Sequence, residues 1–252
     1  MRILYQVDAF TTTPFTGNAA GVVLEAQGMT DAEMLAVARE LNNSETAFVL
    51  PADAADHDVR VRFFTPTTEV PTCGHATVAA HFTRAVEYGL PSGSLAQKTG
   101  SGPIQIVSTG HSKVLVELRD HAAVDTLRPD PAALTALSHE VGSNGFFVFT
   151  RATGDASLLT WSRMFAPAIG IVEDPVTGNG HGPLGAYLVR HGLVPALDGK
   201  LSFTGRQGEA MGRPGDVRVT VETRPGDELH VSITGDAATA FRAELAVPRV
   251  RS

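Results

Sequence analysis

The chain has 252 residues, of which 43% are hydrophobic and 19% are charged. This composition is typical of a globular protein and excludes an intrinsically disordered chain. The net charge is −7 at pH 7, and the 20 basic residues form no cluster of the kind that marks a nucleic-acid-binding surface. We therefore expect no nucleic-acid partner.

Hydropathy and cysteine content bear on the location of the protein. Polar residues interrupt the segment Met1–Asp8 too early for the hydrophobic region of a signal peptide. The sequence has no run of about 18 apolar residues, so we expect neither a transmembrane helix nor a membrane partner. The single cysteine excludes a disulfide framework and a zinc site built from cysteines. Together these features predict a cytoplasmic protein.

Strand and helix signals alternate along the first half of the chain. A helix is expected to begin after Thr30 or Asp31, because Glu33 has the spacing of a capping box and an apolar stripe follows. A second apolar helix is expected over residues 76–88, with Gly89 at its C-terminal end. Strands are expected at residues 3–10, 20–24, 46–50, 59–64, 104–107 and 114–118.

The second half repeats this order about 100 residues later. The helical pattern of residues 34–41 recurs at 134–141, and each copy is followed by a polar turn and an apolar strand. The turns Cys73-Gly74-His75 and Gly178-Asn179-Gly180-His181 each precede an apolar helix. Several landmarks in the same order indicate an internal duplication rather than chance similarity.

The duplication predicts an α+β fold of two pseudo-symmetric halves, each with mainly antiparallel strands and two helices. We place the halves at residues 1–117 and 118–240, with residues 241–252 as a candidate to complete the first half. The proline-containing link at residues 121–131 marks the boundary region. The two helix-opening turns would then face each other across a cleft, where ligands commonly bind.

The helix-opening turns are candidates for anion binding. The first N–H groups of a helix lack an intrahelical acceptor, and the helix dipole favours a negative group there. Gly74 lies in one turn and Gly178 in the other, so that a carboxylate is the ligand group that we expect. The alternative is that these glycines merely permit tight packing.

Glu45 is a candidate acid/base group. It lies in Ser44-Glu45-Thr46, between a helix and a strand, and its counterpart in the second half is Gly145. The duplication thus carries a carboxylate on one side only. Desolvation beside Ala47 and Phe48 would raise the pKa of Glu45 and suit it to giving and taking a proton. The alternative is a solvated glutamate in a turn.

Other polar residues leave several roles open. His75 and His181 are each candidates for a catalytic acid, a metal ligand or a packed histidine, but neither has a companion at metal-motif spacing, so we expect no metal. Cys73 is either an activated thiol at a helix N-terminus or a small buried residue. Asp174 either contacts a substrate or histidine or forms the turn before a proline. The sequence has no GxGxxG dinucleotide loop, no GxxxxGK[ST] loop and no GxSxG motif.

Four segments that occur in order carry a resemblance to a known family. They are Val7-Asp8-Ala9-Phe10 with Pro14-Phe15-Thr16-Gly17-Asn18, then Asn43-Ser44-Glu45-Thr46-Ala47-Phe48, then Phe64-Thr65-Pro66-Thr67-Thr68-Glu69-Val70 with Cys73-Gly74-His75-Ala76-Thr77, and Glu173-Asp174-Pro175-Val176-Thr177-Gly178. Together they resemble the PhzF-like isomerases of phenazine biosynthesis over nearly the whole chain. The resemblance implies the diaminopimelate-epimerase-like fold, in which each of two similar halves wraps a barrel-like sheet around a central helix. It also implies a homodimer and chemistry without a cofactor.

The resemblance also assigns roles to residues. In the family's characterised isomerase, a glutamate in the Ser-Glu-Thr segment moves a proton on a dihydro-hydroxyanthranilate ring. This role falls on Glu45, with His75 and Asp174 in support. The substrate-binding candidates are Asn18, Gly74, Gly178, Asn179 and Gly180.

We therefore expect a cofactor-independent isomerase that moves a proton on a small cyclic or unsaturated carboxylic acid. The second loop departs from the family pattern, because Asn179 places an amide where a hydroxyl is common, and the helix start His181-Gly182-Pro183-Leu184 departs as well. One alternative is a PhzF-like protein that binds small acids or another protein without turnover. Another is an epimerase that depends on Cys73, alone or paired with Glu45. The single cysteine excludes a racemase with two thiols.

Overall fold

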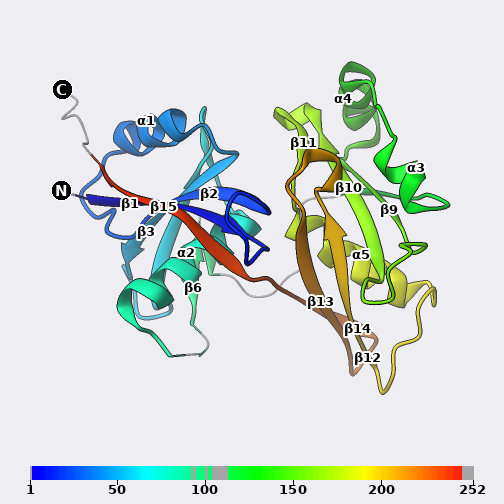
Figure 1. The fold of residues 1–252 in the computed structure, drawn as a ribbon. Helices are drawn as coiled ribbons and strands as arrows, with labels where there is room; N and C mark the ends of the chain where they lie inside the picture. Colours follow the sequence, from blue (N-terminus) through cyan, green and yellow to red (C-terminus); the bar gives the residue numbers. More distant parts are fainter. Residues whose placement is uncertain (1, 92, 94, 100–101, 104–112, 246–252) are drawn as a thin grey trace. The chain divides into compact units, whose positions relative to one another are not determined.

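The computed structural model of the chain describes residues 2–91, 93, 95–99, 102–103 and 113–245. The chain divides into two compact units (Figure 1). Unit 1 comprises residues 1–15, 19–105 and 236–252, and unit 2 comprises residues 16–18 and 106–235. Within the described residues, no helix combines the length and the apolar character that crossing a bilayer requires.

The described residues of unit 1 form one sheet and two helices. The sheet has the order β15-β1-β2-β3-β4-β6-β7, and β5 pairs with β4. The helices are α1 (Asp31–Leu41) and α2 (Gly74–Tyr88). The strands are β1 (Arg2–Ala9), β2 (Asn18–Val23), β3 (Glu45–Pro51), β4 (Val59–Phe64), β5 (Glu69–Val70), β6 (Gln97–Thr99), β7 (Gly102–Pro103) and β15 (Ala237–Leu245).

Unit 2 has the sheet order β14-β13-β12-β10-β9-β8, with β11 on β10. Its helices are α3 (His121–Asp125), α4 (Pro131–Val141) and α5 (Gly178–Arg190), with single 3₁₀ turns η1 (Pro167–Ile169) and η2 (Glu209–Met211). Its strands are β8 (Val114–Glu117), β9 (Phe146–Thr150), β10 (Thr160–Ala166), β11 (Ile171–Asp174), β12 (Lys200–Gln207), β13 (Gly215–Arg224) and β14 (Glu228–Thr234).

The two sheets share one pairing pattern. The pair β2–β3 is parallel and β3–β4 antiparallel, just as β8–β9 is parallel and β9–β10 antiparallel. Thr46 lies opposite Phe64 in unit 1, and Phe146 lies opposite Phe165 in unit 2. The central helices α2 and α5 pack against the strands of their own units (Figure 1). The predicted α+β fold of two pseudo-symmetric halves, with mostly antiparallel strands around a central helix, is confirmed.

Strand alternation decides what each face of the first sheet buries. Successive side chains of a strand point to opposite faces. In β3, Ala47 and Val49 pack in the cluster that includes α2, whereas Phe48 packs in the cluster that includes α1. The helix α2 contributes small side chains to its cluster, which let it lie close to the sheet: Ala76, Ala79 and Ala80. Glu45 shares the parity of Ala47, so the same alternation directs its side chain to the α2 face.

Three boundaries differ from the sequence expectation. The expected division after residue 117 assigns β8 to the first half, whereas β8 pairs with β9 of unit 2. Residues 121–131 hold α3 and the start of α4 rather than a linker between units. The returning C-terminal strand β15 begins at Ala237 and pairs with β1, so the completion of unit 1 starts before residue 241. The differences at β8 and β15 arise because a strand's place depends on a hydrogen-bonding partner distant in sequence. The strand expected at residues 104–107 lies outside the described residues.

A pair of glycines near the starts of the two central helices gives a test of the packing. A Cβ on Gly180 would lie 2.3 Å from Cδ2 of the buried Phe147 ring, whereas one on Gly74 would meet no heavy atom within 4 Å. Because overpacking a core typically costs about 1–3 kcal/mol, we expect Gly180→Ala to lower the free energy of unfolding by that amount. Gly74→Ala should change it by less than about 1 kcal/mol. Urea denaturation measures both, and an equal loss in the two variants would contradict this packing.

Candidate active site

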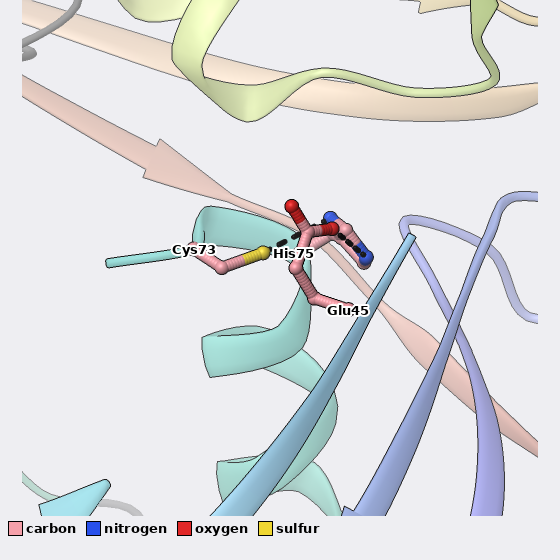
Figure 2. A group of neighbouring side chains, drawn as sticks. All are labelled: Glu45, Cys73 and His75. Carbon is pink, nitrogen blue, oxygen red and sulfur yellow. Dashed lines mark hydrogen bonds and ion pairs between the residues drawn. The ribbon is translucent and has the colours of Figure 1, made fainter. Parts of the chain in front are cut away.

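Three side chains meet at the N-terminal end of α2 (Figure 2). Glu45 comes from the first residue of β3, Cys73 is the residue before the helix, and His75 lies in its first turn. His75 Nε2 is 3.6 Å from Glu45 Oε2, and His75 Nδ1 is 3.4 Å from Cys73 Sγ. The Ser44 hydroxyl lies 3.3 Å from His75 Nε2. The imidazole therefore lies between a thiol on one side and a hydroxyl and a carboxyl on the other.

The local sequence explains how Glu45 reaches this position. Asn42 ends α1 in the left-handed conformation, with φ of 52°, and turns the chain toward β3. Asn43 and Gln6 exchange two side-chain hydrogen bonds of 2.9 Å, which tie the turn to β1. The chain then enters β3 at Glu45 with the parity that points this side chain toward α2. The polar residues that precede Glu45 thus fix the register of the strand.

Burial changes the acid/base character of Glu45. The side chain is only 14% exposed. Burial raises the pKa of the Glu45 carboxyl above its ordinary value, and hydrogen bonds with Ser44 and Cys73 oppose this shift. A carboxyl with a raised pKa is closer to being half-protonated at neutral pH, which suits a group that must both accept and return a proton.

The same three side chains have the geometry to hold a metal ion. One ligand atom each of Glu45, Cys73 and His75 lies within 4.8 Å of the others, and theirs is the one such group in the described part of the chain. A carboxylate, a thiolate and an imidazole form a donor set that zinc accepts, with a fourth position open. The expectation of no metal rested on motif spacing, which cannot detect a ligand as distant in sequence as Glu45.

A second group of residues forms in unit 2 around Asp174, the last residue of β11. Asp174 Oδ1 accepts a hydrogen bond of 2.9 Å from Asn18 Nδ2, and its other oxygen accepts one from the Thr177 hydroxyl. Asn18 Nδ2 also donates to the carbonyl of Val176 at 2.8 Å. Asn18, which the sequence suggests as a substrate-binding residue, is 2% exposed and orients Asp174 and the turn that follows it.

Gln207 supports this turn and was not anticipated from the sequence. Its buried side chain donates to the carbonyl of Asp174 at 2.7 Å and accepts from the Thr177 N–H at 3.0 Å. Gln207 lies at the end of β12, in a segment without any motif. The only signal of its role is the strand pairing of β12 with β10, which sequence patterns do not reveal.

The turn that begins α5 holds the remaining predicted residues. Gly178 is its first helical residue, and the Gly180 N–H donates to the carbonyl of Thr177 at 3.0 Å. The side-chain oxygen of Asn179 is buried and has no hydrogen-bond partner among the described residues. Gly180 thus packs against Phe147, whereas Asn179 has a buried acceptor without a partner among the described residues.

The two central helices begin without a side-chain cap. Thr30, Asp120 and Asp130 cap α1, α3 and α4 with side-chain oxygens, and the predicted capping box of α1 is confirmed. Neither Cys73 nor Thr177 caps the helix that follows it with its side chain. The N-terminal amides of α2 and α5 are therefore the ones suited to an external anion.

His181 is a packed histidine. Its side chain is fully buried, with the ring 5.0 Å from that of Phe147 in an edge-to-face contact. Nδ1 lies 3.0 Å from the carbonyl of Thr177, so that Nδ1 carries the proton. Burial lowers the pKa of His181 to about 4, which keeps the ring neutral. Of the three roles left open for this residue, the structure supports packing.

The structure brings the predicted residues together in two groups. Unit 1 holds Glu45, His75 and Gly74 at the start of α2, and unit 2 holds Asn18 and Asp174 beside the turn of Gly178, Asn179 and Gly180. The sequence did not anticipate Ser44 beside His75 or Gln207 beside Asp174.

The burial of Glu45 predicts a pH-dependent gain in stability for Glu45→Gln. Because the pKa of Glu45 is raised in the folded state, its carboxyl is neutral in both states well below pH 4.5 and costs nothing there. As the pH rises through the raised pKa, the buried carboxylate destabilises the folded protein. We therefore expect Glu45→Gln to raise the melting temperature at pH 8 but not at pH 4. Glu40→Gln, at an exposed position of α1, is the matched control, and an equal effect at both pH values would contradict the burial.

Comparisons with known proteins agree on one family. The family model of phenazine biosynthesis-like proteins, PhzC-PhzF, matches residues 7–107 and 93–243. The uncharacterized isomerase YddE of Salmonella typhimurium is 44% identical over 97% of this chain and 98% of its own length. The trans-2,3-dihydro-3-hydroxyanthranilate isomerase of Pseudomonas chlororaphis is 30% identical over 95% of this chain and 97% of its own.

Solved structures give the same answer for the fold. The crystal structure of a phenazine biosynthesis protein of the PhzF family from Bacillus anthracis superposes with a TM-score of 0.84. It is 26% identical and covers 98% of this chain and 99% of its own. A hydroxyproline epimerase from Agrobacterium vitis, 13% identical with a TM-score of 0.64, shares the fold alone. The epimerase-like fold that the resemblance implies is confirmed.

Proposed function

Because the chain belongs to the PhzC-PhzF family of phenazine biosynthesis-like proteins and is an isomerase like its named relatives, we propose that it moves a proton on a small carboxylic acid, with Glu45 as the acid/base. The observation that carries the proposal is the buried Glu45 carboxyl beside His75 and Ser44 (Figure 2). An isolated buried carboxyl is costly, so its retention next to two hydrogen-bonding groups supports a chemical role.

The proposed reaction needs one group that works in both directions. The Glu45 carboxylate takes a proton from one carbon of the substrate, and the electron pair shifts into the neighbouring unsaturated system. The same carboxyl returns the proton to a different carbon, so that no atom is gained or lost. His75 holds the Glu45 carboxyl and the reacting substrate in place.

Negative charge develops on the substrate carboxylate after Glu45 has removed the proton from carbon. We assign the binding of this carboxylate to amides at the helix N-termini, at Gly74 of α2 and at Gly178 and Asn179 of α5, because the Gly180 N–H already donates to Thr177. Positioned N–H donors of this kind stabilise charge that develops in a transition state. Asp174, held by Asn18, is the second side chain that we assign to substrate contact and proton movement.

The substrate class follows from the relatives and remains part of the proposal. The relative of Pseudomonas chlororaphis acts, by its name, on trans-2,3-dihydro-3-hydroxyanthranilate, which is a cyclic and unsaturated carboxylic acid. This compound and other small cyclic or unsaturated acids are therefore the first to test. The homodimer, the cytoplasmic location and the absence of a cofactor stay predictions.

Proton NMR in D₂O tests the assignment of Glu45. The wild type should exchange or move a proton on at least one of these acids, and Glu45→Gln should lower that rate by about 10²–10⁴-fold, as expected for the loss of a general acid/base. Glu40→Gln is the matched control and should keep the full rate. Treatment with EDTA should also leave the rate unchanged. A cation bound to Glu45 would keep its carboxyl ionised and prevent it from carrying the proton, so the proposed reaction needs no metal ion.

Three results would contradict the proposal in different ways. Full turnover by Glu45→Gln removes the acid/base role. A loss in Cys73→Ala as large as that in Glu45→Gln favours the thiol-dependent epimerase. Binding of the acids to the wild type without any deuterium incorporation favours a protein that binds small acids without turnover.

A further inference from the structure

Unit 2 contains a copy of the acid/base site in which the reactive side chains have been replaced. The shared strand pairing places residue 145 where unit 1 has residue 45, and the starts of α2 and α5 correspond in the same way. Ser44, Glu45 and His75 of unit 1 thus correspond to Asn144, Gly145 and Asn179 of unit 2.

A side chain at the position that corresponds to Glu45 would crowd its neighbours. A Cβ on Gly145 would lie 2.3 Å from Cε of Met164 and 3.0 Å from the carbonyl oxygen of Phe165. The second of these contacts is with backbone, which cannot move aside as the end of a methionine can. The packing of β10 therefore disfavours a side chain at this position.

A cation lies beside this copy of the site instead. Lys113, the residue before β8, is half-buried, and its Nζ donates to Asn144 Oδ1 at 2.6 Å. The carboxylate of Asp174 attracts it electrostatically, but no ion pair among the described residues includes Lys113. An ammonium group has three N–H donors, and the Asn144 bond uses one of them.

The position of Lys113 is costly for the folded protein. Burial lowers the pKa of Lys113 to about 8, and the attraction of Asp174 only partly offsets this. A cation that is kept partly out of water, without an ion-pair partner among the described residues, destabilises the fold. An anionic ligand that pairs with the Lys113 ammonium would offset this cost.

Asn179, the second residue of α5, gives a second and independent observation. Its buried Oδ1 has no hydrogen-bond partner among the described residues, and nearly all buried polar atoms in proteins have one. An amide oxygen only accepts hydrogen bonds, so its partner must donate one. A ligand for this region therefore combines an anionic group with a hydroxyl or amino group.

We propose that Lys113 binds the carboxylate of the substrate and that Asn179 Oδ1 accepts a hydrogen bond from a hydroxyl or amino group of the same molecule. This inference rests on the proposed function and narrows its substrate class to acids that carry such a donor near the carboxylate. Lys113 is then a substrate-binding residue and takes no part in the proton transfer.

A binding experiment tests Lys113 independently of turnover. Cyclohex-1-ene-1-carboxylate and its uncharged carboxamide are titrated into the protein and followed by NMR. The wild type should prefer the carboxylate, and Lys113→Met should weaken carboxylate binding by about 10- to 100-fold, as expected for a hydrogen bond to a charged group. Carboxamide binding should not change. Lys113→Arg should restore most of the preference, because it keeps the charge.

Lys200→Met is the matched control for this experiment. Lys200 is exposed in the same unit and pairs with Glu222 at 2.9 Å, so its loss should change neither affinity. If Lys113 stabilises the fold, Lys113→Met should melt at a lower temperature than the wild type at pH 7. If Lys113 binds the substrate, the melting temperature should be unchanged or higher. For any acid that turns over, KM should rise in Lys113→Met far more than kcat falls.

Three results would overturn the role of Lys113. They are unchanged carboxylate binding in Lys113→Met, an equal loss of carboxylate and carboxamide binding, and a wild type that does not prefer the carboxylate. None of them depends on Glu45. Conversely, full turnover by Glu45→Gln with a normal carboxylate preference would remove the proposed acid/base and leave Lys113 in place.

Discussion

The parity of one strand is the constraint on which the candidate site depends. Side chains of β3 alternate between the faces of the sheet, so Glu45 must share the α2 face with Ala47 and Val49. The turn before β3 cannot slip by a residue without moving the carboxyl to the α1 face and exchanging the apolar side chains that pack on the two faces. The mutual hydrogen bonds of Gln6 and Asn43 hold that turn. A buried carboxyl is thus a consequence of the same register that builds the core.

The duplication repeats this backbone but not its chemistry. Both units place a turn, a parallel strand pair and an uncapped central helix in the same relation. In unit 2 a side chain at Gly145 would crowd Met164 and Phe165. The residues that replace Ser44, Glu45 and His75 there are Asn144, Gly145 and Asn179, and Lys113 lies beside Asn144. We therefore assign the role of Glu45 to unit 1 and not to its counterpart in unit 2.

Local signals in the sequence explain what could be predicted. The capping box of Thr30 and Glu33, the alternation of residues 59–64 and the terminal Gly89 depend on neighbours within a few residues, and the structure agrees with all three. The recurrence of the pattern after about 100 residues predicted two similar halves, because equal patterns bury equal faces. The expected division after residue 117 failed to follow β8, because the partner of that strand is β9, about 30 residues further along the chain. The hydrogen bond from Gln207 to the carbonyl of Asp174 could not be predicted either, because the two residues are distant in the sequence.

The sequence by itself determined the fold class, the internal duplication, the two turns that open the central helices and the candidate acid/base at Glu45. These depend on residue type, on local spacing and on a pattern that recurs after about 100 residues. The tertiary structure alone decided the grouping of Glu45 with Cys73 and His75, the hydrogen bonds between Asn18 and Asp174, and the position of Lys113. It also made His181 a neutral packed histidine rather than a reactive one. These outcomes depend on which distant segments exclude water from one another, and burial of that kind is a property of the folded chain.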